Sequence, residues 1–133
     1  MITAVDSSIL ICIAKGEPLA ERCVDLLARA RTEGLAVICE VVAAELFSVL
    51  PDESRFADLL GALGLDFSAI ELKAATLAGR IHRDYRRQGG PREHLIPDFL
   101  IAAHAATQAD RLAALDRGYL RVYFPKLPVV VPG

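Results

Sequence analysis

The chain has 133 residues, of which 53% are hydrophobic and only 6% aromatic. This length suits one domain, residues 1–133, that buries about two thirds of the surface of its unfolded form around an aliphatic core. The first residues lack the basic and apolar regions of a secretory signal, and no apolar run approaches the roughly eighteen residues of a membrane span. The sequence therefore indicates neither export nor membrane insertion.

The charged residues and the cysteines narrow the class of protein further. The formal net charge is −2 at pH 7, which argues against a nucleic-acid-binding protein. When the four carboxylates discussed below are set aside, however, the remaining scaffold is slightly basic. The three cysteines, an odd number without metal-ligand spacing, are Cys12, Cys23 and Cys39. We interpret them as reduced core thiols, which predicts a cytoplasmic location.

The first half of the chain predicts strands that alternate with helices. A β-branched run at residues 2–5 predicts a strand that ends at Asp6, and Ser7 and Ser8 then cap a helix over 9–14. The next predicted elements are a helix over 18–31, a strand over 35–38, a helix over 41–47 and a helix over 52–63. The helix over 41–47 is apolar nearly all round, so we expect it to be buried.

The second half continues this alternation. The predicted elements are a strand over 65–67, a helix from 68 to about 87, a loop over 88–91, a helix that begins at Ile96 and Pro97, a strand over 111–115 that ends at Asp116, a short helix over 119–124 and a strand over 127–131. Pro128 predicts that the last strand lies at an edge. The whole pattern predicts an α/β fold with a mostly parallel central sheet of about five strands and helices on both faces.

Four carboxylates fall where such a fold gathers its ligands, at the carboxyl ends of the strands. Asp6 and Asp116 are each predicted to end a strand, and Asp98 lies in the first turn of a helix opened by proline. Glu45 has apolar neighbours on its helix and no arginine or lysine there, so it needs a partner or a bound cation.

Each of these acids also has a purely structural explanation. Asp6 and Asp98 could simply cap helices, Asp116 could be a turn residue, and Glu45 could have a structural partner. Taken together, four carboxylates at one sheet edge favour a hard cation, Mg²⁺ or Mn²⁺, over Zn²⁺. We do not expect the three histidines to be ligands of this ion; these are His82, His94 and His104.

The same residues lie in motifs that resemble the PIN domain, and more closely the VapC toxins of bacterial type II toxin-antitoxin modules. The motifs are Asp6-Ser7-Ser8-x-Leu10, Ala44-Glu45-Leu46, Pro97-Asp98-x-x-Ile101-Ala102-Ala103 and Leu115-Asp116-Arg117-Gly118-Tyr119. The resemblance covers the chain in order and implies a Mg²⁺- or Mn²⁺-dependent endoribonuclease with a small VapB-type antitoxin. It places the catalytic and metal-binding quartet at Asp6, Glu45, Asp98 and Asp116, and it implies a homodimer.

Several polar residues near these motifs each have two explanations, one functional and one structural. Ser7 could contact metal-bound water or phosphate, or it could cap a helix. Glu40 departs from the family pattern, and it either adds an acid near the site or starts a helix. Arginines outnumber acids in the segment 80–93, and the candidates for RNA contact there are Arg83, Arg86 and Arg87. The alternative for these arginines is a solvated helix end.

Other classes of protein fit the sequence less well. A phosphoacceptor receiver domain needs an aspartate after its third strand, for which Asp66 is a poor candidate. A nucleotide-binding fold needs a glycine-rich first turn, and neither common phosphate-binding motif occurs. The remaining alternative to a nuclease is a catalytically inactive PIN-like module that binds RNA or a protein.

Overall fold

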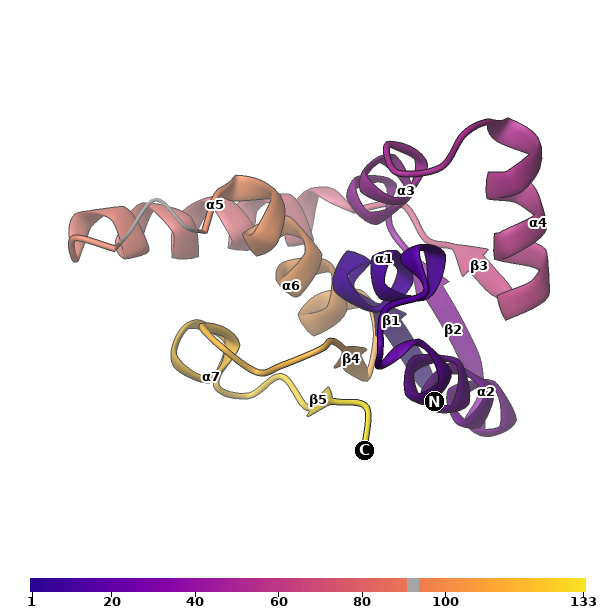
Figure 1. Cartoon of the computed structure of the whole chain (residues 1–133). Helices are drawn as coiled ribbons and strands as arrows, with labels where there is room; N and C mark the ends of the chain where they lie inside the picture. Colours follow the sequence, from indigo (N-terminus) through magenta and orange to yellow (C-terminus); the bar gives the residue numbers. More distant parts are fainter. Residues whose placement is uncertain (91–93) are drawn as a thin grey trace.

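Five parallel strands form one sheet in the order β3-β2-β1-β4-β5 in the computed structural model, which describes residues 1–90 and 94–133 (Figure 1). The strands are β1 (Ile2–Val5), β2 (Leu35–Ile38), β3 (Leu65–Phe67), β4 (Arg111–Ala113) and β5 (Val129–Val130). In the central register, Ala4 of β1 lies opposite Val37 of β2 and Leu112 of β4. The order of the strands reverses between β1 and β4, where doubly wound sheets bind their ligands.

Seven helices among the described residues connect the strands. They are α1 (Ser7–Lys15), α2 (Ala20–Glu33), α3 (Glu40–Phe47), α4 (Glu53–Leu63), α5 (Leu72–Arg87), α6 (Ile96–Gln108) and α7 (Leu120–Tyr123). Helix α2 packs against β2, and α6 packs against β1 and β4. Because parallel crossovers are right-handed, the reversal of strand order places α1–α4 on one face and α5–α7 on the other. The predicted α/β architecture of five strands is confirmed.

Local sequence explains where the first helices begin and end. The Asp6 carboxylate accepts a hydrogen bond from the Ser8 amide (3.2 Å) and so caps α1, and Asp52 caps α4 in the same way through the Arg55 amide (2.9 Å). Helix α1 ends at Gly16, whose φ of 62° is a left-handed conformation that other residues adopt only with strain.

The core is aliphatic, as the composition predicts. Its largest fully buried side chains include Ile9, Leu10 and Leu112, and its buried aromatic side chains include Phe99 and Phe124. The three cysteines are buried and form no disulfide, which agrees with their interpretation as core thiols. Each helix of the described chain is too short or too polar to span a bilayer.

Several predicted boundaries in the second half are wrong. Helix α5 begins at Leu72 instead of residue 68, because residues 68–71 run as an extended link that other elements hold. The Ser68 amide donates to the Ile38 carbonyl (2.8 Å), and the Ile70 amide donates to the Glu40 carboxylate (2.8 Å). Glu40 therefore starts α3 and anchors this link, and it does not line the pocket described below.

Strands β4 and β5 are shorter than predicted. Strand β4 ends at Ala113. The Ala114 amide still donates to the Val130 carbonyl of β5 (3.1 Å), and the chain then leaves the sheet. Asp116 consequently lies three residues beyond the strand instead of ending it. Strand β5 keeps only Val129–Val130, and it is an edge strand as Pro128 predicts.

Helix α3 is not buried all round, which corrects the expectation from its composition. Only Val42 and Leu46 are buried, whereas the side chains of Phe47 and Val49 are each 38% exposed. The helix packs on α1, α4 and α6 and nothing covers its remaining face within residues 1–90 and 94–133. Phe47 contacts Phe56 of α4 edge-on, with ring centroids 5.4 Å apart. An apolar surface therefore remains open along α3.

Candidate active site

The strand ends bring two of the predicted acids to the β1–β4 reversal. The Asp6 amide donates to the Ala113 carbonyl (2.9 Å), which continues the β1–β4 ladder one step past β1. Asp116 reaches the same edge from the turn after β4. In that turn Gly118 has a φ of 35°, and a Cβ at this position would lie 2.8 Å from Asp116 Oδ1. Glycine is thus required for Asp116 to keep its place.

A cavity of about 310 Å³ opens at this edge. Three of the four predicted acids, Asp6, Asp98 and Asp116, line it. Among the described residues, its remaining polar lining is Ser8, His94, Arg117 and Tyr119. The fourth acid, Glu45, does not line the cavity, but it lies close enough to Asp6 and Asp98 for their charges to raise its pKa. Four carboxylates from four separate elements therefore gather around one site.

Two serines after β1 hold two of these acids. The Ser8 hydroxyl donates to the Asp6 carboxylate and accepts a hydrogen bond from the Leu115 amide (3.3 Å). The Ser7 hydroxyl donates to Glu45 Oε1 (2.9 Å). Ser7 thus supplies the partner that Glu45 needs on an otherwise apolar helix, and Ser8 ties the start of α1 to the loop after β4.

Asp98 is positioned by the beginning of α6. Its carboxylate accepts a hydrogen bond from the Leu95 amide (3.1 Å), and His94 Nδ1 lies 3.8 Å from the same oxygen. The Tyr119 hydroxyl donates to the Asp98 backbone carbonyl (3.0 Å). The rings of His94 and Tyr119 lie over each other with centroids 4.1 Å apart. Helix start, histidine and tyrosine therefore form one wall of the cavity.

The titration behaviour of the site reflects crowded negative charge. Burial raises the pKa of Asp6, and the nearby Asp98 charge raises it further. Burial and the charges of Asp6 and Asp98 likewise raise the pKa of Glu45. The pKa of Tyr119 is raised by burial first and then by all four carboxylates, so its hydroxyl remains a proton donor at neutral pH. A cation in this crevice would relieve the repulsion that these shifts express.

The donor set suits a hard cation, because it consists of carboxylate oxygens without a thiolate. His94 lies beside Asp98, with its Nδ1 3.8 Å from the carboxylate. In the described part of the chain, no three potential ligand side chains lie close enough together to hold a metal ion. The acids surround the cavity and would have to converge on an ion that enters it.

The family model of the PIN domain matches residues 3–125. The chain belongs to the PIN domain family. This confirms the family resemblance predicted from the four sequence motifs, three of whose acids line the cavity. Comparison with curated protein sequences found no match.

Solved structures share the fold of this PIN domain over nearly its whole length. VapBC2 from Rickettsia felis, bound to a DNA fragment from its promoter, matches with a TM-score of 0.70 at 22% identity, and the match covers 98% of each chain. VapBC-1 from nontypeable Haemophilus influenzae gives 0.72 at 18% identity, with 98% of each chain covered. A toxin-antitoxin complex from Klebsiella pneumoniae gives 0.66 at 18%, again over 98% of each. At these identities the likeness shows the fold.

Sequence reasoning missed four polar residues of this PIN domain's cavity, of which Arg117 stood in the last motif without a role of its own. Ser8 was predicted only as a helix cap, although a cap beside a strand-end acid is placed to bind that acid. Tyr119 stood in a motif without a role of its own. His94 lies four residues before Asp98 and outside the helix, so helical spacing gave no signal for it.

The arginines predicted to contact RNA do not line the cavity. Arg83, Arg86 and Arg87 lie near the C-terminal end of α5, which extends away from the sheet (Figure 1). Arg83 is half exposed and lies 3.8 Å from the Asp84 carboxylate. Their contact with RNA stays a prediction. Arg92, from the same predicted cluster, and the end of the predicted loop over 88–91 lie outside the described residues.

Proposed function

We propose that this PIN domain is a Mg²⁺- or Mn²⁺-dependent endoribonuclease and the toxin of a VapBC-type toxin-antitoxin module. The observation that carries the proposal is the meeting of three carboxylates around a cavity of about 310 Å³ at the β1–β4 reversal, with Glu45 beside them, in a chain of this family. Hydrolysis of an RNA phosphodiester bond needs an activated water and neutralisation of charge on the phosphoryl oxygens. Metal bound by carboxylates is suited to both tasks.

In this proposal Asp6, Asp98 and Asp116 hold the ion, and Glu45 binds it or orients a water. When bound, the metal would lower the pKa of a water and would stabilise the charge that develops on the phosphate and the leaving oxygen. Ser8 fixes the Asp6 carboxylate, and Ser7 does the same for Glu45. Such supporting hydrogen bonds hold ligands in the orientation that binding requires.

The raised pKa values fit this role of the acids. Asp6 and Glu45 gain from a nearby cation, since the cation stabilises the ionised form that burial disfavours. Tyr119 keeps its proton and holds the backbone of Asp98 through its hydroxyl. We therefore assign Tyr119 a positioning role at the start of α6.

A protein partner is part of the proposal. The solved structures that share the fold are VapBC assemblies and a toxin-antitoxin complex. The apolar surface around Phe47 and Val49 on α3 and the following loop is the kind of surface that an amphipathic segment of a VapB-like antitoxin covers. We also propose a homodimer, because exposed apolar side chains of this size favour association.

The function is tested with the purified protein and single-stranded RNA. We expect cleavage in Mn²⁺, none in EDTA, and loss of cleavage in Asp98→Asn, which removes a charged ligand and retains the side-chain shape. The control is Asp58→Asn, which makes the same change on an exposed face of α4. Binding of RNA without metal-dependent cleavage by the wild type would favour the inactive PIN-like module instead.

A further inference from the structure

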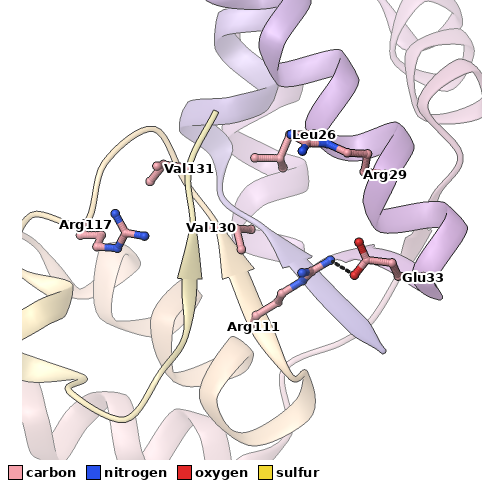
Figure 2. Close-up of a pocket in the computed structure, with 7 residues that line it drawn as sticks. All are labelled: Leu26, Arg29, Glu33, Arg111, Arg117, Val130 and Val131. Carbon is pink, nitrogen blue, oxygen red and sulfur yellow. Dashed lines mark hydrogen bonds and ion pairs between the residues drawn. The ribbon is translucent and has the colours of Figure 1, made fainter. Parts of the chain in front are cut away.

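A second pocket lies beside the acidic cavity, between α2 and the edge of the sheet that β4 and β5 form. Its volume is about 270 Å³. Figure 2 shows side chains of α2 on one side and side chains of the sheet and its loop on the other. The side chains that define it are Arg29, Arg111, Arg117, Glu33, Leu26 and Val130. Three arginines and one glutamate thus line this pocket.

Arg111 is held rigidly in this pocket. Its Nε donates to the buried Thr3 hydroxyl (2.8 Å), and its Nη2 donates to Glu33 Oε2 (3.0 Å), as the dashed line in Figure 2 marks. The Arg111 side chain is only 17% exposed, so this ion pair has a fixed geometry. Among the residues that the structure describes, Glu33 is the only acid of the lining, and it is paired with Arg111.

The other two arginines of the pocket form no ion pair with a described residue. Arg117 Nη2 donates to the Val129 carbonyl (3.1 Å), a neutral acceptor that positions the guanidinium without neutralising it. Arg29 borders a neighbouring hollow with Asp25 and Gly133. Over residues 1–90 and 94–133, no carboxylate lies within 4.0 Å of the Arg29 or Arg117 guanidinium. The pocket therefore carries an excess of positive charge.

Arg117 joins this pocket to the acidic cavity, because it lines both of them. It directly follows Asp116 in the turn after β4, so adjacent residues present an acid to one pocket and a guanidinium to the other. If one phosphate of a longer chain were bound beside the acids, a neighbouring phosphate of that chain could lie beside Arg117.

We propose that the pocket formed by Arg29, Arg111 and Arg117 binds a phosphate group. Guanidinium groups offer several N–H donors in a planar fork that matches phosphate oxygens. Within residues 1–90 and 94–133, the lining of the pocket includes no aromatic side chain on which a nucleobase could stack, and its one acid is paired with Arg111. Resting on the proposed function, we assign this phosphate to the RNA backbone next to the scissile bond; free phosphate shares the same chemistry.

The test compares Arg29→Glu with Arg31→Glu in the full chain. Both changes reverse one charge on α2, but residues 29 and 31 point about 200° apart around the helix, and the Arg31 guanidinium packs against Gly64 instead. Binding of a short single-stranded RNA is measured by fluorescence anisotropy in EDTA, where no metal supports cleavage, at several salt concentrations. In parallel, the Tm is measured with inorganic phosphate and with chloride of equal ionic strength. Circular dichroism checks folding of both variants.

We expect Arg29→Glu to raise the Kd for RNA about tenfold, the cost of losing a charge-assisted hydrogen bond, while Arg31→Glu changes it less than about threefold. The slope of log Kd against log salt should fall by about 0.7 in Arg29→Glu, as for one lost phosphate contact on single-stranded nucleic acid. Phosphate should raise the Tm of the wild type and of Arg31→Glu, and leave Arg29→Glu unchanged.

Each other outcome decides a separate question. If phosphate stabilises the protein through Arg29 but both variants bind RNA equally, the pocket takes a free phosphate and the assignment to RNA is wrong. If the two variants behave alike in both measurements, the pocket proposal is overturned. If the wild type fails to cleave RNA in Mn²⁺ while the Arg29 effects persist, the proposed function fails and the phosphate pocket stands.

Discussion

The acidic cavity and the arginine pocket adjoin at Asp116 and Arg117, yet they are built differently. The acids are crowded, and burial raises the pKa of Asp6 and Glu45 above their ordinary values. In the arginine pocket one ion pair, Arg111 with Glu33, fixes the framework. The acidic cavity therefore stores repulsion that a bound cation relieves, whereas the arginine pocket is a preformed receptor for an anion.

Among the changes to the two pockets, we expect Asp6→Asn in the acidic cavity to have the largest effect on RNA cleavage. The change removes a negative ligand at the centre of the cavity, while asparagine still accepts the Ser8 amide bond that caps α1. RNA cleavage in Mn²⁺ should fall by about a hundredfold or more, with Tm in EDTA no lower than in the wild type. Initial rates of cleavage and a thermal melt measure the two quantities. Cleavage at the wild-type rate would remove Asp6 from the site.

A smaller loss of activity is expected when an acid keeps its charge but loses its support. Ser8→Ala removes the hydroxyl that joins the Asp6 carboxylate to the Leu115 amide, so cleavage should fall by about tenfold, as for other supporting residues of metal sites. Thr76→Ala is the control, since its hydroxyl only donates within α5 to the Lys73 carbonyl. Equal rates in both variants would mean that Asp6 needs no such support.

Stability should reveal the repulsion in the acidic cavity directly. Because the folded state raises the pKa of Glu45 above its usual 4.5, it binds the proton more tightly than the unfolded state. This contribution to stability is therefore lost as pH rises from about 4.5 through the raised pKa. In EDTA at about pH 7, Glu45→Gln should melt a few degrees above the wild type, and the difference should shrink as pH falls toward 4.5. Saturating Mn²⁺ should stabilise the wild type more than the variant.

The reading would be wrong if Glu45→Gln melted below the wild type in EDTA and both proteins responded equally to Mn²⁺. Glu45 would then be a structural residue that Ser7 alone satisfies. Glu53→Gln provides the control, because Glu53 lies in the first turn of α4 and its charge favours the helix dipole there. It should lower the Tm slightly at neutral pH.

The smallest effect concerns arginines outside both pockets. Arg86 lies in the last turn of α5, on the part of the helix that extends from the sheet. Arg86→Glu should weaken RNA binding in EDTA by only about twofold at physiological salt, because exposed charges are screened over about 8 Å. A loss as large as that of Arg29→Glu would move the RNA path from the arginine pocket to α5.

The sequence revealed the acidic cavity because each acid lies at a diagnostic place. Asp6 directly follows a β-branched strand, Asp98 follows a helix-opening proline, and Glu45 stands out as a charge among apolar neighbours. Parallel topology then implies that strand ends meet, so the meeting of these acids could be predicted without coordinates. Of the two strands that lead to these acids, β4 was given a wrong end, because the apolar residues 114 and 115 continue the pattern of a strand beyond its last residue, Ala113.

The arginine pocket gave no comparable signal. Arg29 lies on the exposed face of an ordinary amphipathic helix, Arg111 begins a strand, and Arg117 lies in a turn, where arginine is usually solvated. Their convergence depends on how α2 crosses the sheet and how β5 pairs with β4, which are tertiary facts. The open face of α3 was missed for a similar reason, because composition alone does not say whether another element covers an apolar helix.

Binding of Mn²⁺ to the metal-free protein tests the central claim, that the acids at the β1–β4 reversal form a divalent cation site. Electron paramagnetic resonance of free Mn²⁺ gives the Kd for the wild type, Asp98→Asn and Asp58→Asn without any need for cleavage. We predict saturable binding by the wild type and Asp58→Asn, and a Kd at least about tenfold higher for Asp98→Asn. Equal affinity in all three proteins, with the fold intact, would contradict the account.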